Sequence, residues 1–304
     1  MKLTLVIPDL LWQEETPPLA ADTSALNELL RFGTISPPFH SVSDLYRHFL
    51  WQDSLRGQAL RELGLPSETA AVLGCPVWQQ MRMHSMNTLS GRDIAVSNEE
   101  AARLCRDLSE FYVSDGLAFY PYRAGLWLIT LPQAVDWQVP CALDIYGQVD
   151  GSQRAEGRDA ALWLKWQTEI QMFLHAHPLN AERAAQGRPG INGLWLWTDL
   201  HGTAENPNIA ADNDWSAQAH ETAPYDWTAF ERLAAEQSGF SDGIIVLDDL
   251  SAARHTADAW AYRDTLSAWD ARFFAPAWQA LKEGRLKNLV IHTNGGSLTV
   301  KAKA

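Results

Sequence analysis

The stretch "LHAHPLNAERAAQGRPGINGLWLWTD", residues 174–199, joins the end of one regular element to the start of another. Pro178 prevents a helix that arrives from residue 174 from continuing, because proline lacks a backbone N–H. After a Gly-Arg-Pro-Gly turn, the apolar run "GLWLW" at 193–197 has the length and composition of a buried strand. A helix that leads into a strand through a short polar connection indicates an α/β fold.

The same alternation extends toward both ends of the chain. The β-branched run "LTLVIP" at 3–8 predicts a buried strand, and the leucine spacing in 24–32 predicts a helix with Ser24 as its cap. Ser97 and Glu100 have the spacing of a capping box, so a helix is expected to begin there. We further predict helices over 159–175 and 256–282 (kinked at Pro276), strands at 125–131, 242–249 and 288–293, and a loop over 134–158.

Composition excludes several classes of protein. Hydrophobic residues make up 46% of 304, which is enough for one large core or two unequal ones. A net charge of −13 argues against a nucleic-acid partner, since phosphate binding needs a concentrated basic surface. The basic end "VKAKA" is interpreted as a solvated tail.

The three cysteines are scattered without metal-type spacing, which fits a reducing cytoplasm. Pro8 and Asp9 interrupt the N-terminal apolar run, and no segment has the roughly 20 apolar residues of a membrane span. We therefore expect a cytoplasmic protein with no membrane partner.

The segment "HPLNAERAAQGRPGINGLWLW" resembles a region of the archaeal-type cofactor-independent phosphoglycerate mutases, where an inserted domain returns to the main domain. The positions that match this family's pattern are His177, Asn180, Arg183, Gly187 and Asn192. The chain resembles a second group, the RpfE-type regulatory proteins, more closely. The stretches that carry this resemblance are "TEIQMFLHAHPLN" at 168–180 and "INGLWLWT" at 191–198.

The resemblance implies an alkaline-phosphatase-like fold: a mainly parallel sheet flanked by helices, with a smaller inserted α/β domain. It places the core domain at 1–77 and 191–304 and the insertion at 78–190. It also makes Ser67, in "PSETAAVLG" at 66–74, the counterpart of the phosphoryl-accepting nucleophile. The alternative for Ser67 is a helix-capping serine.

Active members of the mutase family hold two divalent metals, and the resemblance implies which residues would remain here. Asp9 keeps one carboxylate, and Asp248, Asp249 and His255 follow a strand near the C-terminus. The carboxylate expected four residues before His255 is replaced by Ser251, and the final Asp-His pair reads as Thr293-Asn294. One retained carboxylate cannot hold two cations, so we expect no cofactor, with Mn²⁺ or Mg²⁺ at a reduced site as the alternative. A cap or surface role is the other interpretation of these residues.

The matched residues His177, Asn180, Arg183 and Asn192 predict the remains of an anion site at the junction of the two domains. Arg183 suits bidentate contact with a phosphate or carboxylate. The competing interpretation is that His177 caps the preceding helix and Asn180 orders the turn.

Two functions therefore remain open. The first is a catalytically degenerate mutase-like protein that binds a small anionic ligand or a regulatory protein partner. The second is a surviving phosphomutase or phosphatase that uses Ser67 and a reduced metal site.

Overall fold

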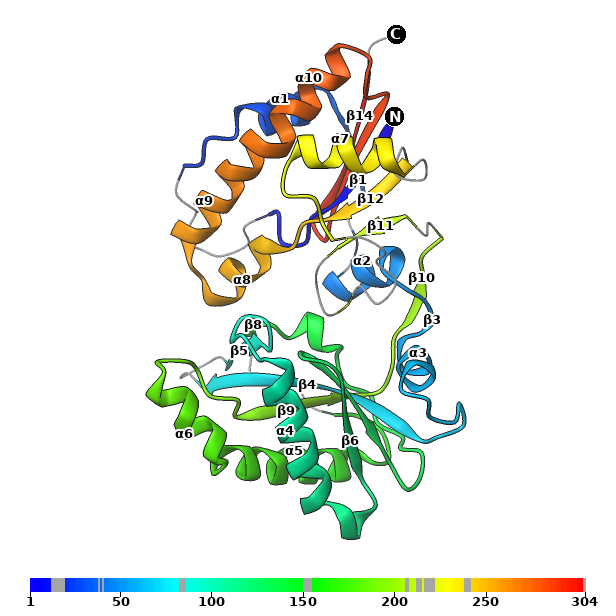
Figure 1. The fold of residues 1–304 in the computed structure, drawn as a ribbon, viewed down its shortest axis with the longest axis vertical. Coiled ribbons are helices and arrows are strands. Elements are labelled where there is room, and N and C mark those ends of the chain that lie inside the picture. The colour runs from blue at the N-terminus through cyan, green and yellow to red at the C-terminus, as the bar shows by residue number, and fades with distance from the viewer. Residues whose placement is uncertain are drawn as a thin grey trace. The chain divides into compact units, whose positions relative to one another are not determined.

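The computed structural model describes residues 1–11, 20–37, 39, 41–81, 86–149, 155–205, 208–211, 215, 222–237 and 242–302. The chain forms two compact units. Unit 1 consists of Met1–Gln52 and Gly202–Ala304, and unit 2 consists of Asp53–His201. Each unit combines a sheet with helices, so the α/β class predicted from the alternation is confirmed (Figure 1).

Unit 1 is built on a sheet whose central strands are parallel. The strand order is β11-β12-β1-β13-β14-β2; β11, β12, β1 and β13 pair in parallel, and β14 and β2 extend the edge antiparallel. The bounds are β1 (Lys2–Val6), β2 (Thr34–Ser36), β11 (Ile209–Ala210), β12 (Asp242–Val246), β13 (Asn288–Thr293) and β14 (Gly296–Lys301).

The two faces of this sheet carry different helices, because side chains alternate along a strand. Leu3, Leu5 and Ile7 belong to a buried cluster that includes residues of α1, α7, α8, α9 and α10. On the opposite face, His292 of β13 contacts Phe49 of α2. The bounds are α1 (Ser24–Phe32), α2 (Val42–Phe49), α7 (Trp227–Glu236), α8 (Asp249–Thr256), α9 (Ala259–Trp269) and α10 (Ala275–Lys282).

The single long helix predicted over 256–282 is several elements. Ala257 is left-handed (φ 55°) and ends α8. The Asp258 carboxylate then accepts the N–H groups of Trp260 and Ala261 and so begins α9. A π-helical turn, η4 (Asp270–Phe274), separates α9 from α10, whose first turn contains Pro276. Local caps therefore divide a stretch in which the apolar residues keep the spacing of one continuous helix.

Two further expectations for unit 1 need correction. Ser24 does not cap α1, because the Asp270 carboxylate accepts the N–H groups of Ala25 and Leu26 at 3.0 and 2.7 Å. The C-terminal "VKAKA" is only partly a tail. Val300 and Lys301 belong to β14, which pairs with β13, and residues 303–304 lie outside the described residues.

Unit 2 has a sheet in which the described pairings are antiparallel, with order β6-β7-β4-β5-β8 and β9 also paired to β4. The α4 helix packs on β6 and α5 on β9 (Figure 1). The strands are β4 (Ala71–Met81), β5 (Met86–Ser90), β6 (Ala118–Arg123), β7 (Leu126–Thr130), β8 (Gly147–Val149) and β9 (Gly193–Trp197). The helices are α3 (Leu55–Glu62), α4 (Asn98–Phe111), η1 (Val113–Asp115), η2 (Ala142–Asp144), α5 (Ala160–His175) and α6 (Pro178–Ala185).

The strongest local sequence pattern in unit 2, the capping box, is confirmed. The capping box is present as predicted, since Ser97 accepts from the Glu100 N–H and Glu100 accepts from the Ser97 N–H. The loop expected over 134–158 is wrong in part, because it contains η2 and β8, whose short polar segments carry little periodicity.

The boundaries expected at 77/78 and 190/191 differ from those of the structure. The β4 strand runs through residue 78, and its Leu73–Val77 segment pairs with the whole of β9. Both strands therefore belong to unit 2. The chain passes between the units in β3 (Gln52–Ser54) and β10 (His201–Thr203), which pair with each other. Among the described residues, no helix is long and apolar enough to cross a membrane.

Candidate functional site

Three polar residues follow the carboxyl ends of neighbouring parallel strands in unit 1. Asp248 follows β12, Asp9 follows β1 and Asn294 follows β13. The register aligns Val246, Val6 and His292, so the three strands end at the same edge of the sheet. This edge is where α/β sheets place their ligands.

Asp9 is buried, at 8% exposure, and its carboxylate is held by neutral hydrogen-bond donors. The Ser251 hydroxyl donates to Oδ2 at 2.8 Å, and the Asn294 amide approaches Oδ1 at 3.5 Å. Asn294 also accepts the Asp9 backbone N–H at 2.9 Å. The turns after β1 and β13 are thus tied together through side chains.

The backbone of Asp9 is left-handed, with φ 59°, a conformation that aspartate tolerates better than most residues. The Tyr262 hydroxyl faces the carbonyl oxygens of Asp9 and Leu10 at 3.1 and 2.6 Å. Burial and the nearby Asp9 charge raise the pKa of Tyr262 above its ordinary value, so this hydroxyl remains a donor.

The other predicted metal ligands lie on or beside α8. Asp248 is buried just before the helix, Asp249 is its exposed first residue, and His255 is half-buried in its last turn. Within the described ranges, no three or more His, Cys, Asp or Glu side chains form a group that could hold a metal ion. A metal role for these residues stays a prediction.

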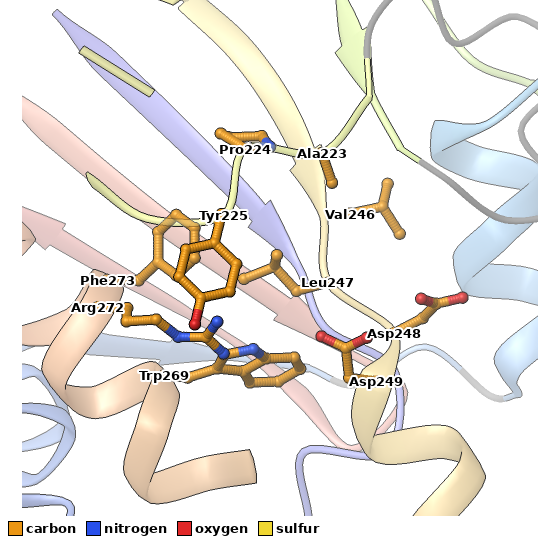
Figure 2. A pocket seen from close by; sticks show the side chains of 10 residues that line it. All are labelled: Ala223, Pro224, Tyr225, Val246, Leu247, Asp248, Asp249, Trp269, Arg272 and Phe273. Carbon is orange, nitrogen blue, oxygen red and sulfur yellow. The ribbon is translucent and has the colours of Figure 1, made fainter. Parts of the chain in front are cut away.

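A pocket of about 250 Å³ opens beside the carboxyl end of β12 (Figure 2). Its walls come from the segment before α7, the β12–α8 connection and the junction of α9 with η4. The lining residues are Ala223, Pro224, Tyr225, Val246, Leu247, Asp248, Asp249, Trp269, Arg272 and Phe273.

The π-helical turn η4 directs its side chains to two sides. Asp270 bonds the first turn of α1, whereas Arg272 and Phe273 line the pocket next to Trp269. The Arg272 guanidinium lies 4.3 Å from the ring centroid of Tyr225. Short π-helical insertions occur frequently at functional sites, because they reorient side chains within a helix.

The residues of the predicted anion site all lie in unit 2, and the structure gives them contacts within the chain. Arg183 is 1% exposed and forms an ion pair with Glu100 at 2.7 Å. It also donates to the carbonyl oxygens of Pro189, at 2.7 Å, and Ile94. Arg188 binds the same carboxylate at 2.9 Å. An anion could reach Arg183 only by displacing these bonds.

The pKa shifts of Glu100 and Arg183 follow from burial and from their ion pair. Burial alone would raise the pKa of Glu100, but the Ser97 N–H and the two arginines outweigh it and hold that pKa below its ordinary value. Burial lowers the pKa of Arg183, and the bond to Glu100 opposes this effect. The single Glu100 carboxylate is therefore paired with two guanidinium groups inside unit 2.

Three other matched residues also act as structural connectors. His177 caps α6, which follows it, by accepting the Leu179 N–H at 3.2 Å; the expectation that it caps the preceding helix is wrong. Its Nε2 lies 3.0 Å from Asp107. Asn180 donates to the carbonyl oxygens of Leu174 and Ile191 and accepts the Ile191 N–H.

Asn192 exchanges two bonds with the backbone of Gln79, at 2.7 and 2.8 Å. These bonds agree with the turn-ordering interpretation of this segment, and the anion site stays a prediction.

Ser67 lies in an exposed turn of unit 2, before β4. Its hydroxyl donates to Glu68 at 3.2 Å. The helix-capping alternative is wrong, because the following "ETAAVLG" leads into a strand. Ser67 and Asp9 belong to different units, and the nucleophile role stays a prediction.

Sequence reasoning missed the residues that surround the pocket. Trp269 and Phe273 fall within the single helix predicted over 256–282, and no predicted element includes Tyr225. A weak signal existed in Pro276, which stands where an uninterrupted helix would need a backbone N–H.

No family model and no curated protein matches the chain. Among solved structures, it is similar to a cofactor-independent phosphoglycerate mutase from Thermoplasma acidophilum DSM 1728, with 14% identity and a TM-score of 0.38 over 98% of this chain and 89% of that chain. It is also similar to the PH0037 protein from Pyrococcus horikoshii, with 12% identity and a TM-score of 0.47 over 99% and 87%. Likenesses at these scores carry no argument about function.

Proposed function

We propose that this chain is a catalytically degenerate, phosphoglycerate-mutase-like protein with a binding or regulatory role. The observation that supports it is the pairing of Asp9 with Ser251 and Asn294. The resemblance puts metal-ligand carboxylate or imidazole groups at about these two positions. Here both are neutral, and both contact the one carboxylate that is retained.

The physical reason is competition for the carboxylate lone pairs. A divalent cation needs several oxygen or nitrogen ligands that present lone pairs to it. A hydroxyl or amide that donates to Asp9 presents hydrogen instead, and it satisfies the buried charge without a cation. The neutral donors therefore substitute for the metal in stabilising Asp9.

The test is elemental analysis of the purified chain, followed by mutase and phosphatase assays with added Mn²⁺ or Mg²⁺. The probes are 3-phosphoglycerate and p-nitrophenyl phosphate. We expect substoichiometric metal and no turnover above background. Stoichiometric metal, with turnover that disappears in Asp9→Asn, would show the alternative function, a phosphomutase or phosphatase with a reduced metal site.

A gain-of-ligand experiment tests the same proposal from the other side. The double variant Ser251→Asp/Asn294→Asp places three carboxylates at the edge of the sheet. We expect its Kd for Mn²⁺, measured by titration calorimetry, to tighten by an order of magnitude or more, since affinity follows the number of charged ligands. Thr256→Asp, at the exposed end of α8, adds charge without joining the group and serves as the control. Equal Kd values for the double variant and the wild type would contradict the proposal.

A further inference from the structure

The turn between β13 and β14 is an Asn-Gly pair. The two strands pair with each other up to Thr293 and Gly296, and Asn294-Gly295 joins them. In such a pair the backbone nitrogen of the glycine can attack the side-chain amide carbon of the asparagine, because glycine has no Cβ to hinder the approach. The sequence contains one other Asn-Gly pair, Asn192-Gly193, so the two can be compared within one molecule.

The backbone nitrogen of Gly295 is available for this attack. Its N–H has no hydrogen-bond partner among the described residues. Asn294 and Gly295 are half-buried, so water reaches the turn. A Cβ at position 295 would overlap the Leu11 side chain. Glycine is therefore the residue that fits this turn without a shift of Leu11, and it leaves the nitrogen unhindered.

The amide oxygen of Asn294 is held by two donors. Its Oδ1 accepts the Asp9 backbone N–H at 2.9 Å and the Thr293 hydroxyl at 3.1 Å. An attack on Cγ places negative charge on this oxygen, and donors that are already in position stabilise such a charge. Asp9 and Thr293 are both buried, where a hydrogen bond to a charge is stronger than in water. The turn therefore favours the step electrostatically.

The second pair, Asn192-Gly193, lies in a different environment. Gly193 is buried in β9 and pairs with Val77 of β4. Both ends of the Asn192 amide are bonded to the backbone of Gln79, at 2.7 and 2.8 Å. Closing a ring between Gly193 N and Asn192 Cγ would disrupt the pairing of the strands. The folded chain should therefore protect this asparagine.

We propose that Asn294 is a site of spontaneous deamidation. Gly295 N forms a bond to Asn294 Cγ, the Cγ–Nδ2 bond breaks, and Nδ2 leaves as ammonia with the proton from the Gly295 amide. One water then opens the cyclic imide at one of its two carbonyl carbons and breaks that carbon's bond to nitrogen. The product is aspartate or isoaspartate. One water is consumed, one ammonia is released, and no atom is oxidised or reduced.

The modification changes the charge beside Asp9. The Nδ2 of Asn294 lies 3.5 Å from Asp9 Oδ1. Aspartate replaces this NH₂ group with a carboxylate oxygen, so two like charges face each other. Isoaspartate adds a carbon to the backbone of the turn. Both products weaken the connection between the turns after β1 and β13. The inference goes beyond the proposed function, because it requires only the turn and its contacts.

The test follows both asparagines in the folded full chain during storage in neutral buffer. Trypsin releases residues 288–301 as one peptide, and mass spectrometry with fragmentation distinguishes the amide from the acid products. We expect Asn294 to convert at least about tenfold faster than Asn192. In urea the two should convert at similar rates, because each then has only its glycine neighbour. Asn288, which precedes Leu289 in the same peptide, should stay an amide.

Variants test the donors at Oδ1. Thr293→Val keeps the shape but loses the hydroxyl, and it should slow the conversion of Asn294 by about tenfold or more in the folded chain, with no change in urea. Thr293→Ser keeps a hydroxyl and should keep the rate. Thr256→Val is the matched control, since Thr256 bonds only to carbonyl groups of its own helix.

Each outcome decides the proposal. Equal rates for Asn294 and Asn192 in the folded chain, or a rate in Thr293→Val equal to that of the wild type, would overturn it. Faster conversion of Asn294 that depends on the Thr293 hydroxyl supports it. If Thr293→Val does not fold, the comparison of the two asparagines in the wild type decides. Metal-dependent turnover of the fresh chain would overturn the proposed function and leave the deamidation site as it is.

Discussion

Asp9 in unit 1 and Glu100 in unit 2 are both buried carboxylates, at 8% and 9% exposure, but their partners differ. Glu100 is paired with Arg183 and Arg188. Asp9 is bonded by a hydroxyl and an amide, with no ion pair among the described residues. Burial of a charge is costly unless it is paired. The Glu100 carboxylate has such pairing, whereas the Asp9 carboxylate is stabilised by neutral hydrogen-bond donors.

The difference teaches how to distinguish a structural charge from a candidate functional one. The Glu100 carboxylate is paired with two arginines within unit 2 and ties α4 to the α6–β9 connection. Asp9 combines a carboxylate bonded by neutral donors, a left-handed backbone and the carboxyl edge of parallel strands. Strained backbone and buried charge gather at functional sites more often than elsewhere. The residues singled out by sequence similarity in unit 2 are therefore the less suited to a ligand.

The largest expected effect is in unit 2. Arg183→Ala should lower the free energy of unfolding by about 3–5 kcal/mol, because it leaves a buried carboxylate with one cation fewer. Chemical denaturation followed by circular dichroism measures the loss. Arg103→Ala, which breaks an exposed pair with Glu182, should cost no more than about 1 kcal/mol. Similar losses for the two variants would remove the contrast between the sites.

At the edge of unit 1, Ser251→Ala removes one donor from a charged acceptor. We expect a loss of about 1.5–3 kcal/mol, the value typical of hydrogen bonds to charged groups. Hydrogen exchange of the β1 and β13 amides reports it within unit 1. Thr256→Ala, which loses only a bond to its own helix, is the control and should stay within about 0.5 kcal/mol. If Ser251→Ala is as stable as the control, neutral donors do not stabilise Asp9.

The pH dependence of stability should also distinguish the units. Burial, together with the nearby His48, lowers the pKa of His292 from 6.5 to about 4. The unfolded chain therefore binds more protons at this residue between those values. The stabilisation is present above pH 6.5 and is lost as the pH falls toward 4. A shift of this size corresponds to about 3 kcal/mol, which partial solvent exposure reduces to about 1–2 kcal/mol.

Glu100 behaves differently, because its pKa is held below the ordinary value of 4.5. Its contribution is present above pH 4.5 and is lost only as the pH falls below it. Urea unfolding at pH 7.5 and 5.0 checks both statements. His292→Gln should flatten the change between these two pH values, and Glu100→Gln should not. A pH slope that survives in His292→Gln would contradict the assignment.

The smallest effect is expected at Ser67. Its exposed hydroxyl contacts only the neighbouring Glu68 among the described residues, so Ser67→Ala should change the free energy of unfolding by less than about 0.5 kcal/mol. Thermal and urea unfolding measure this. Phosphatase assays on the same variant examine the nucleophile hypothesis: a turnover present in the wild type and absent in Ser67→Ala would shift the candidate site toward unit 2.

Local sequence patterns determined the elements whose signals lie within one turn or strand. The capping box at Ser97, the strand at 193–197 and the end of α5 ahead of Pro178 follow from side chains and backbone groups a few residues apart. Such groups meet whatever the rest of the chain does, because their distance along the backbone already limits their distance in space.

Tertiary structure alone decided which residues meet across long intervals. Asp270 caps a helix that begins 246 positions earlier in the sequence, at Ser24, and Ser251 reaches Asp9 across 242 positions. The pocket collects residues from three separate segments. No local hydrophobic period predicts these long-range contacts. They depend on which strands become neighbours in the sheet, and strand order is set by the packing of the whole unit. The sequence alone therefore determined the class of fold and most of its elements, and the folded chain decided where a ligand site can form.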